Sequence, residues 1–94
     1  MADRLQRKTD RYQSLLAAGC ADAEIDQSLD ADDRGAAAEC LEMAEAYLAD
    51  GDHFRSNDDD VTALAAYSYG HGWLDAAIRM GFLQGTEEGD LFAN

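Results

Sequence analysis

The sequence predicts an all-α protein, a small three-helix bundle, and three observations lead to that prediction. Apolar residues recur at helical spacing over three long stretches, and no stretch shows the alternation of a strand. Proline is absent from all 94 residues. Asp and Gly stand at the ends of the periodic stretches, where helices begin and end. A chain of this length forms one domain with a modest core, which excludes a deep cleft between two domains.

The first predicted helix covers residues 2–18, and we expect Gly19 to end it. Its inner positions follow a 3-4 rhythm and are Leu5, Lys8, Tyr12, Leu15 and Gly19. Four of the seven basic residues of the chain also lie here: Arg4, Arg7, Lys8 and Arg11. They suggest either a phosphate-binding surface or a solvated face that offsets an acidic body. We favour the second interpretation, because the net charge of the chain would repel nucleic acid.

Residues 20–29 allow two interpretations. Asp22 could cap a short helix over residues 22–29 that points Ile25 and Leu29 inward. The same segment could instead be a linker that docks those two side chains.

The second predicted helix covers residues 31–56, with Asp30, Asp32 or Asp33 as its cap. Its predicted inner face consists of Ala37, Cys40, Leu41, Ala44, Tyr47, Leu48, Gly51 and Phe54. Its predicted outer face carries Glu39, Glu42, Ala46 and His53. A glycine inside a helix costs about 1 kcal/mol relative to alanine, so Gly51 indicates close contact with a neighbouring backbone.

The third predicted helix, residues 60–81, is the centre of the bundle. One of three successive aspartates before it, at 58–60, can cap it, and Gly81 can end it. One inward row consists of Leu64, Tyr67, His71, Leu74 and Ile78, and the row beside it of Ala63, Ala66, Gly70, Trp73, Ala77 and Met80. Two rows indicate contact with helices on two sides. Asp75 and Arg79 are spaced i and i+4 and can form an ion pair on the solvent-exposed face of this helix.

A short turn over 56–60 makes the second and third helices antiparallel neighbours. The single domain is assigned to residues 1–83, and residues 84–94 to a flexible acidic tail in which Leu91 and Phe92 are the only large apolar side chains.

The net charge of −13, from 20 acidic and 7 basic residues, indicates a salt-rich solvent. Such charge density destabilises a small domain in dilute buffer, and salt screens it. A signal-peptide pattern and an apolar run of about 18 residues are both missing, so we expect a cytoplasmic protein without membrane contact. Cys20 and Cys40 lack the CxxC spacing and are expected to be free thiols.

The segment AEAYLADGDHFRSNDDDVTALAAYSYGHGWLDAAIRMGFL, residues 44–83, resembles the archaeal domain-of-unknown-function family 357. The resemblance is most specific over 63–65, 67–69 and 71–75, and it implies a short helical archaeal protein without an assigned activity. The same hairpin is similar to one tetratricopeptide unit, whose characteristic positions would be Tyr47, Gly51, Phe54, Ala63 and Tyr67. Such repeats need about three units to be stable alone, so we expect a similar packing and not a solenoid.

His71 is the most distinctive polar residue, since it lies on the apolar face of the central helix. It could act with Tyr47 and Tyr67 as an acid, base or ligand, or it could be a core histidine bonded to a tyrosine hydroxyl or a carbonyl. The two cysteines and two histidines lack zinc spacing, and neither a catalytic set nor a cofactor motif is present, so we expect no metal, cofactor or catalytic residues.

Two functions follow from these patterns. The first is a non-enzymatic protein-protein interaction module, with a protein partner or a second copy as its ligand, because the apolar helix surface exceeds what three short helices cover. The alternative is a small enzyme or ligand-binding domain that uses His71. The candidate contact residues are His71, Tyr67, Tyr47, Trp73, Asp75 and Gly70. Exposure of Tyr69 or Trp73 would favour the first function.

Overall fold

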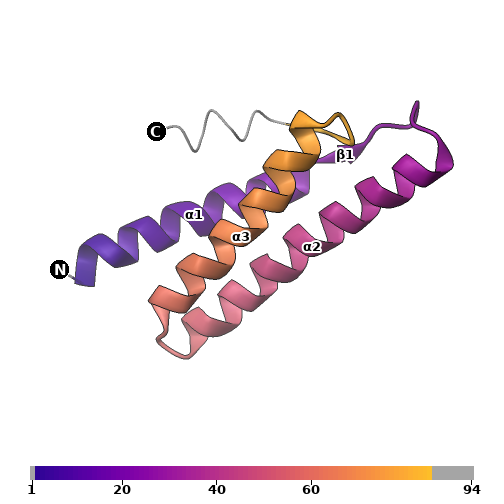
Figure 1. Cartoon of the computed structure of the whole chain (residues 1–94). Coiled ribbons are helices and arrows are strands. Elements are labelled where there is room, and N and C mark those ends of the chain that lie inside the picture. The colour runs from indigo at the N-terminus through magenta and orange to yellow at the C-terminus, as the bar shows by residue number, and fades with distance from the viewer. Residues whose placement is uncertain (1, 86–94) are drawn as a thin grey trace.

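The computed structural model describes residues 2–85, with side chains from residue 4 onward. Its elements are α1 (Ala2–Asp22), β1 (Glu24–Ile25), α2 (Ala31–Ser56), α3 (Asp60–Arg79) and β2 (Leu83–Gln84). Figure 1 shows α2 and α3 side by side as a hairpin, with α1 crossing α3 on its other side. The predicted all-α bundle is therefore confirmed, with α3 packed against both other helices.

The ends of α2 and α3 follow the predicted caps. The carboxylate of Asp30 accepts a hydrogen bond of 2.8 Å from the amide of Asp33, and α2 spans the residues predicted for it. At α3 the cap is Asp59, which accepts from the amide of Thr62 at 3.1 Å. Gly81 has φ of 82°, the left-handed conformation that ends a helix, so α3 ends slightly before the predicted limit.

The prediction for α1 is wrong at its end and at one position of its inner face, Lys8, whereas Tyr12 packs against the core as predicted. Gly19 lies buried inside the helix, which runs on to Asp22. Lys8 is exposed, and the buried positions are Thr9, Leu16 and Cys20 together with Gly19. Because the Thr9 hydroxyl donates to the Leu5 carbonyl at 2.7 Å, its polar group is satisfied within the helix and the side chain can face the core.

The possible helix over 22–29 is also wrong, as is the expectation of no strand. Glu24 and Ile25 pair antiparallel with Gln84 and Leu83, which ties the end of α1 to the end of α3. Ile25 and Leu29 pack against the core, as the linker interpretation predicted. Residue 84, assigned to the tail, thus belongs to β2, whereas 86–94 lie outside the described residues.

The core forms where the three helices meet. It includes Leu16 of α1, Ala37 and Ala44 of α2, and Tyr67 and Leu74 of α3, with Leu83 of β2 beside them. The predicted inner and outer faces of α2 are confirmed by the burial of its side chains. On α3, however, Trp73 and Met80 are exposed by 39% and 67%, because α2 and α1 leave one side of that helix uncovered.

Candidate interaction surface

His71 is enclosed by the protein, with only 1% of its surface exposed. Its Nε2 lies 3.0 Å from the carbonyl oxygen of Tyr12, so Nε2 carries the proton that it donates. The Tyr12 ring meets the imidazole edge-on, with centroids 5.7 Å apart. Burial lowers the pKa of His71 below its ordinary value, against the opposing effects of this hydrogen bond and of Asp75. These contacts are those of a core histidine bonded to a carbonyl of a neighbouring helix.

Tyr67 and Tyr47, the predicted companions of His71, have other partners. The hydroxyl of the fully buried Tyr67 donates to Asp52 at 2.6 Å, and burial together with this carboxylate raises the pKa of the phenol. Tyr47 lies against Tyr69, with ring centroids 5.6 Å apart and planes at 31°. The polar and ring contacts described for the three residues therefore go to different partners: His71 to Tyr12, Tyr67 to Asp52 and Tyr47 to Tyr69.

The bond between Tyr67 and Asp52 belongs to a polar network that fastens α1 to the hairpin. Gln13 of α1 donates to Asp52 at 2.5 Å and accepts from Arg55 at 2.8 Å. Arg55 also pairs with Asp10 at 2.5 Å. This network could not be predicted from the sequence, because Asp10 and Gln13 of α1 lie 39 to 45 positions before their partners on α2. Only the fold brings them together.

Gly70 and Asp75 have structural positions. A Cβ at Gly70 would lie 2.6 Å from Leu16 and 3.1 Å from Tyr47, so the glycine allows close packing of all three helices. The predicted pair of Asp75 and Arg79 is present, with Nε and Oδ2 2.9 Å apart.

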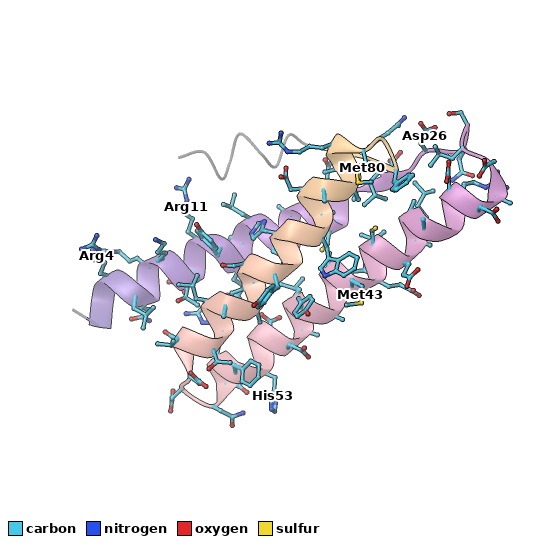
Figure 2. The ribbon with its side chains drawn as sticks, viewed as in Figure 1. Arg4, Arg11, Asp26, Met43, His53 and Met80 are labelled. Atoms are coloured by element: carbon cyan, nitrogen blue, oxygen red, sulfur yellow. The ribbon has the colours of Figure 1, made fainter. Side chains whose placement is uncertain are left out.

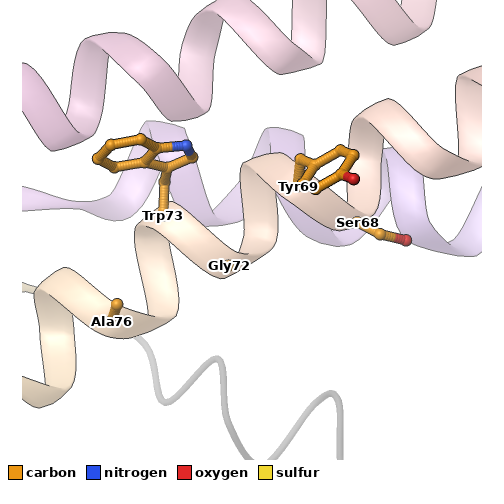
Figure 3. Close-up of a pocket in the computed structure, with 5 residues that line it drawn as sticks. All are labelled: Ser68, Tyr69, Gly72, Trp73 and Ala76. Carbon is orange, nitrogen blue, oxygen red and sulfur yellow. The ribbon is translucent and has the colours of Figure 1, made fainter.

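The uncovered side of α3 carries the aromatic residues that remain accessible. Tyr69 is 65% exposed and Trp73 is 39% exposed. Figure 3 shows both rings on one side of α3, one turn apart, with Gly72 and Ala76 on the same helix. These residues line a shallow open hollow together with Ser68. A Cβ at Gly72 would meet nothing within 4 Å, so the surface there is open to solvent.

The same surface continues onto α2 through the contact between Tyr47 and Tyr69. Since α2 and α3 are antiparallel, the residue one turn before Tyr47, Met43, stands level with the residue one turn after Tyr69, Trp73. Met43 is partly exposed. We call this surface the aromatic face, and define it by Met43, Tyr47, Tyr69, Gly72, Trp73 and Ala76.

Carboxylates border the aromatic face along α2. Asp50 follows Tyr47 by three residues and Glu39 precedes Met43 by four, which places both on the same side of the helix as the face. Both are exposed. The chain contains no Lys or Arg over residues 35–54 or 56–78. Arg79, three residues after Ala76, is the cation near the end of the face on α3, and its charge is paired with Asp75. The part of the face along α2 is therefore bordered by unbalanced carboxylates.

The basic group of α1 is a separate surface. Arg4, Arg7, Lys8 and Arg11 are all exposed, and Figure 2 shows Arg4 and Arg11 projecting from that helix. Among residues 2–85, no group of three His, Cys, Asp or Glu side chains could hold a metal ion. In the same part of the chain, none of the helices is long and apolar enough to cross a membrane.

A family model described as "Protein of unknown function (DUF357)" matches residues 11–83. The match covers most of the chain and extends from α1 to β2. The chain belongs to this family. The matched region thus contains the whole hairpin, the aromatic face, β1 and the first residue of β2. It begins after three of the four basic residues of α1. Neither a curated protein nor a solved structure matches the chain.

Proposed function

We propose that this family member is a non-enzymatic protein-protein interaction module and that its partner binds the aromatic face. The observation that carries the proposal is the exposure of Tyr69 and Trp73 on a strongly acidic chain. Aromatic rings contribute much of the binding energy in protein interfaces, and charged residues elsewhere keep the remaining surface hydrated. Isolated apolar side chains are common on surfaces, but here Tyr69 contacts Tyr47 and lines a shallow hollow on α3 together with Trp73.

The alternative, an enzyme or ligand-binding domain that uses His71, has less support. A reacting histidine must reach its substrate, and His71 is 1% exposed with its Nε2 bonded to the Tyr12 carbonyl. Tyr67 uses its hydroxyl on Asp52. The hydrogen bonds that pair His71 and Tyr67 within the protein therefore leave these groups less available for catalysis.

The composition of the chain supports a proposal about the cellular environment in which it works. We infer a salt-accumulating cytoplasm, because 20 acidic side chains on 94 residues repel one another less in concentrated salt. An archaeal source is what the family resemblance implies. Cys20 and Cys40 are not joined in a disulfide, which agrees with a reducing compartment.

Site-specific photo-crosslinking tests the proposed surface. A photoreactive amino acid replaces Tyr69 in one version of the chain and Ala18, an exposed residue of α1, in the other. Irradiation in cells of the source organism is expected to give a defined adduct from position 69 only. The protein identified in that adduct is then purified, and its binding to the native chain is expected to weaken at least tenfold with Tyr69→Ser. Equal adducts from both positions, or binding that ignores Tyr69→Ser, would contradict the proposal.

A second copy of the chain is the other occupant that this function allows. Sedimentation in molar KCl distinguishes it: a dimer that dissociates on Tyr69→Ser would make self-association the function of the face. A monomer would indicate that the partner is a different protein.

A further inference from the structure

We infer that the partner of the aromatic face is a cationic amphipathic helix, which completes a four-helix arrangement with α2 and α3. This inference rests on the proposed function and specifies the chemistry of its ligand. It follows from the shape of the face, from the charges that border it and from the charge of a second copy.

The shape of the face suits a helix. The antiparallel helices α2 and α3 meet at the contact of Tyr47 and Tyr69, and a shallow hollow on α3 adjoins this contact. The third helix, α1, packs against both of them. On α3 the positions between the rings are small, Gly72 and Ala76, so an added helix can approach closely there. In a four-helix bundle, a pair of helices is covered by another helix on each of its two faces. Here α1 would cover one face of the α2–α3 pair and the partner helix the other.

The charge bordering the face selects a cationic ligand. Glu39 and Asp50 lie beside Met43 and Tyr47 on α2, both exposed, and residues 35–54 contain no basic side chain to balance them. An apolar stripe flanked by Lys or Arg would place its large side chains between the aromatic rings and its cations against these carboxylates. Complementary charge raises the association rate and excludes partners of the wrong sign.

A second copy fits the face less well. Each copy brings a net charge of −13, and its own aromatic face is bordered by the same carboxylates. The exposed cations of α1 do not stand beside an unused apolar stripe, because Leu16 and Thr9 of that helix are already buried in the core. The chain therefore lacks a described segment that combines a free apolar stripe with basic flanks.

Trp73 allows a direct test, because it is the only tryptophan in the chain and belongs to the face. Three tryptophan-free model helices of about 18 residues, or five turns, serve as probes: Leu/Lys, Leu/Gln and Leu/Glu with the same apolar stripe. Each is titrated into the full chain while the fluorescence of Trp73 is recorded. The buffer contains the lowest KCl concentration at which circular dichroism shows the chain fully helical.

The Leu/Lys helix is expected to bind at least tenfold more tightly than the Leu/Gln helix, and the Leu/Glu helix more weakly still. The double variant Glu39→Gln with Asp50→Asn should weaken Leu/Lys binding about fivefold, as expected for the loss of two partly exposed charge pairs. The matched control is Glu24→Gln with Glu45→Gln, which removes the same charge from exposed positions off the face and should change binding less than twofold. Tyr69→Ser should weaken binding at least tenfold.

Other results overturn the inference. Equal binding of the three helices would remove the preference for cations but leave an interaction surface in place. Leu/Lys binding that ignores Tyr69→Ser, or that falls equally in both charge variants, would reveal attraction to the acidic chain as a whole. Failure of every helix to bind would also reject a helical ligand, and a concentration-dependent dimer under the same conditions would assign the face to a second copy.

Discussion

The ring of Tyr67 lies directly over Gly51, with no room for a side chain between the two helices. A Cβ at Gly51 would meet the ring carbons Cε1, Cδ1 and Cζ of Tyr67. The ring cannot move away easily, because it is fully buried and its hydroxyl is held by Asp52. This contact fixes the spacing of α2 and α3, and thereby the hairpin that presents the aromatic face.

Gly51→Ala is expected to destabilise the protein by about 1 to 3 kcal/mol, since overpacking outweighs the gain in helix propensity. Denaturation by urea at constant KCl measures the effect. The control is Gly35→Ala in the same helix, where a Cβ meets nothing within 4 Å. That variant should be stabilised by about 0.5 to 1 kcal/mol, and equal effects of the two substitutions would refute the packing argument.

Tyr67→Phe should cost about 1 to 2 kcal/mol, because it removes the hydroxyl that donates to Asp52. The comparison is Tyr69→Phe, at a ring that is 65% exposed, where a change below about 0.5 kcal/mol is expected. Thermal or urea unfolding of both variants gives the answer. Loss of stability in Tyr69→Phe alone would show that the assignment of the two tyrosines is reversed.

Stability should fall as the pH is lowered from 7 toward 5.5, through His71. Burial lowers the pKa of this group in the folded state, so below its ordinary value of 6.5 the unfolded chain binds a proton that the folded chain does not. The free energy of unfolding therefore rises with pH in this window and levels off above it. In His71→Gln the slope between pH 5.5 and 7 should be smaller than in the native chain. Identical slopes would show that His71 does not contribute.

The carboxylates beside the aromatic face should control which ions reach Trp73. Relative to a free tryptophan amide in the same buffer, caesium is expected to quench the fluorescence of Trp73 more efficiently than iodide, because Glu39 and Asp50 attract cations and repel anions. The ratio of the two normalised quenching constants should fall in the double variant Glu39→Gln with Asp50→Asn. Neutral acrylamide is the control, and its quenching should be the same in both proteins. An iodide preference in the native chain would contradict the assigned charge.

The residues differ in how far their sequence pattern predicts their structure. The bounds of α2 follow from a long apolar period and from Asp30 as a cap, and both signals act locally. Thr9 could not be placed in the core from its polarity, since its burial depends on the hydroxyl's bond to the Leu5 carbonyl. β1 and β2 have only two residues each, too few for an alternating pattern, and their pairing requires the ends of α1 and α3 to meet.

The candidate site was only partly predictable for a similar reason. Periodicity assigned Trp73 to an inward row, but whether a row is covered depends on where the other helices lie. Here α1 and α2 take up two sides of α3 and leave the side of Tyr69 and Trp73 uncovered. The position of His71 on the apolar face of α3 indicated a core residue. Its partner, the Tyr12 carbonyl, could not be predicted, because that contact exists only where α1 crosses α3.

The pairing of β1 with β2 has a practical consequence for attaching probes to this protein. It holds Gly85 near Ala23 and Ile78, where a Cβ would contact both. Ile78 is nine residues beyond Tyr69, and at 100° per residue that is the opposite side of α3. A dye, bead or surface linked through Gly85 would therefore be anchored behind the hairpin, with the rings of Tyr69 and Trp73 pointing away from the support.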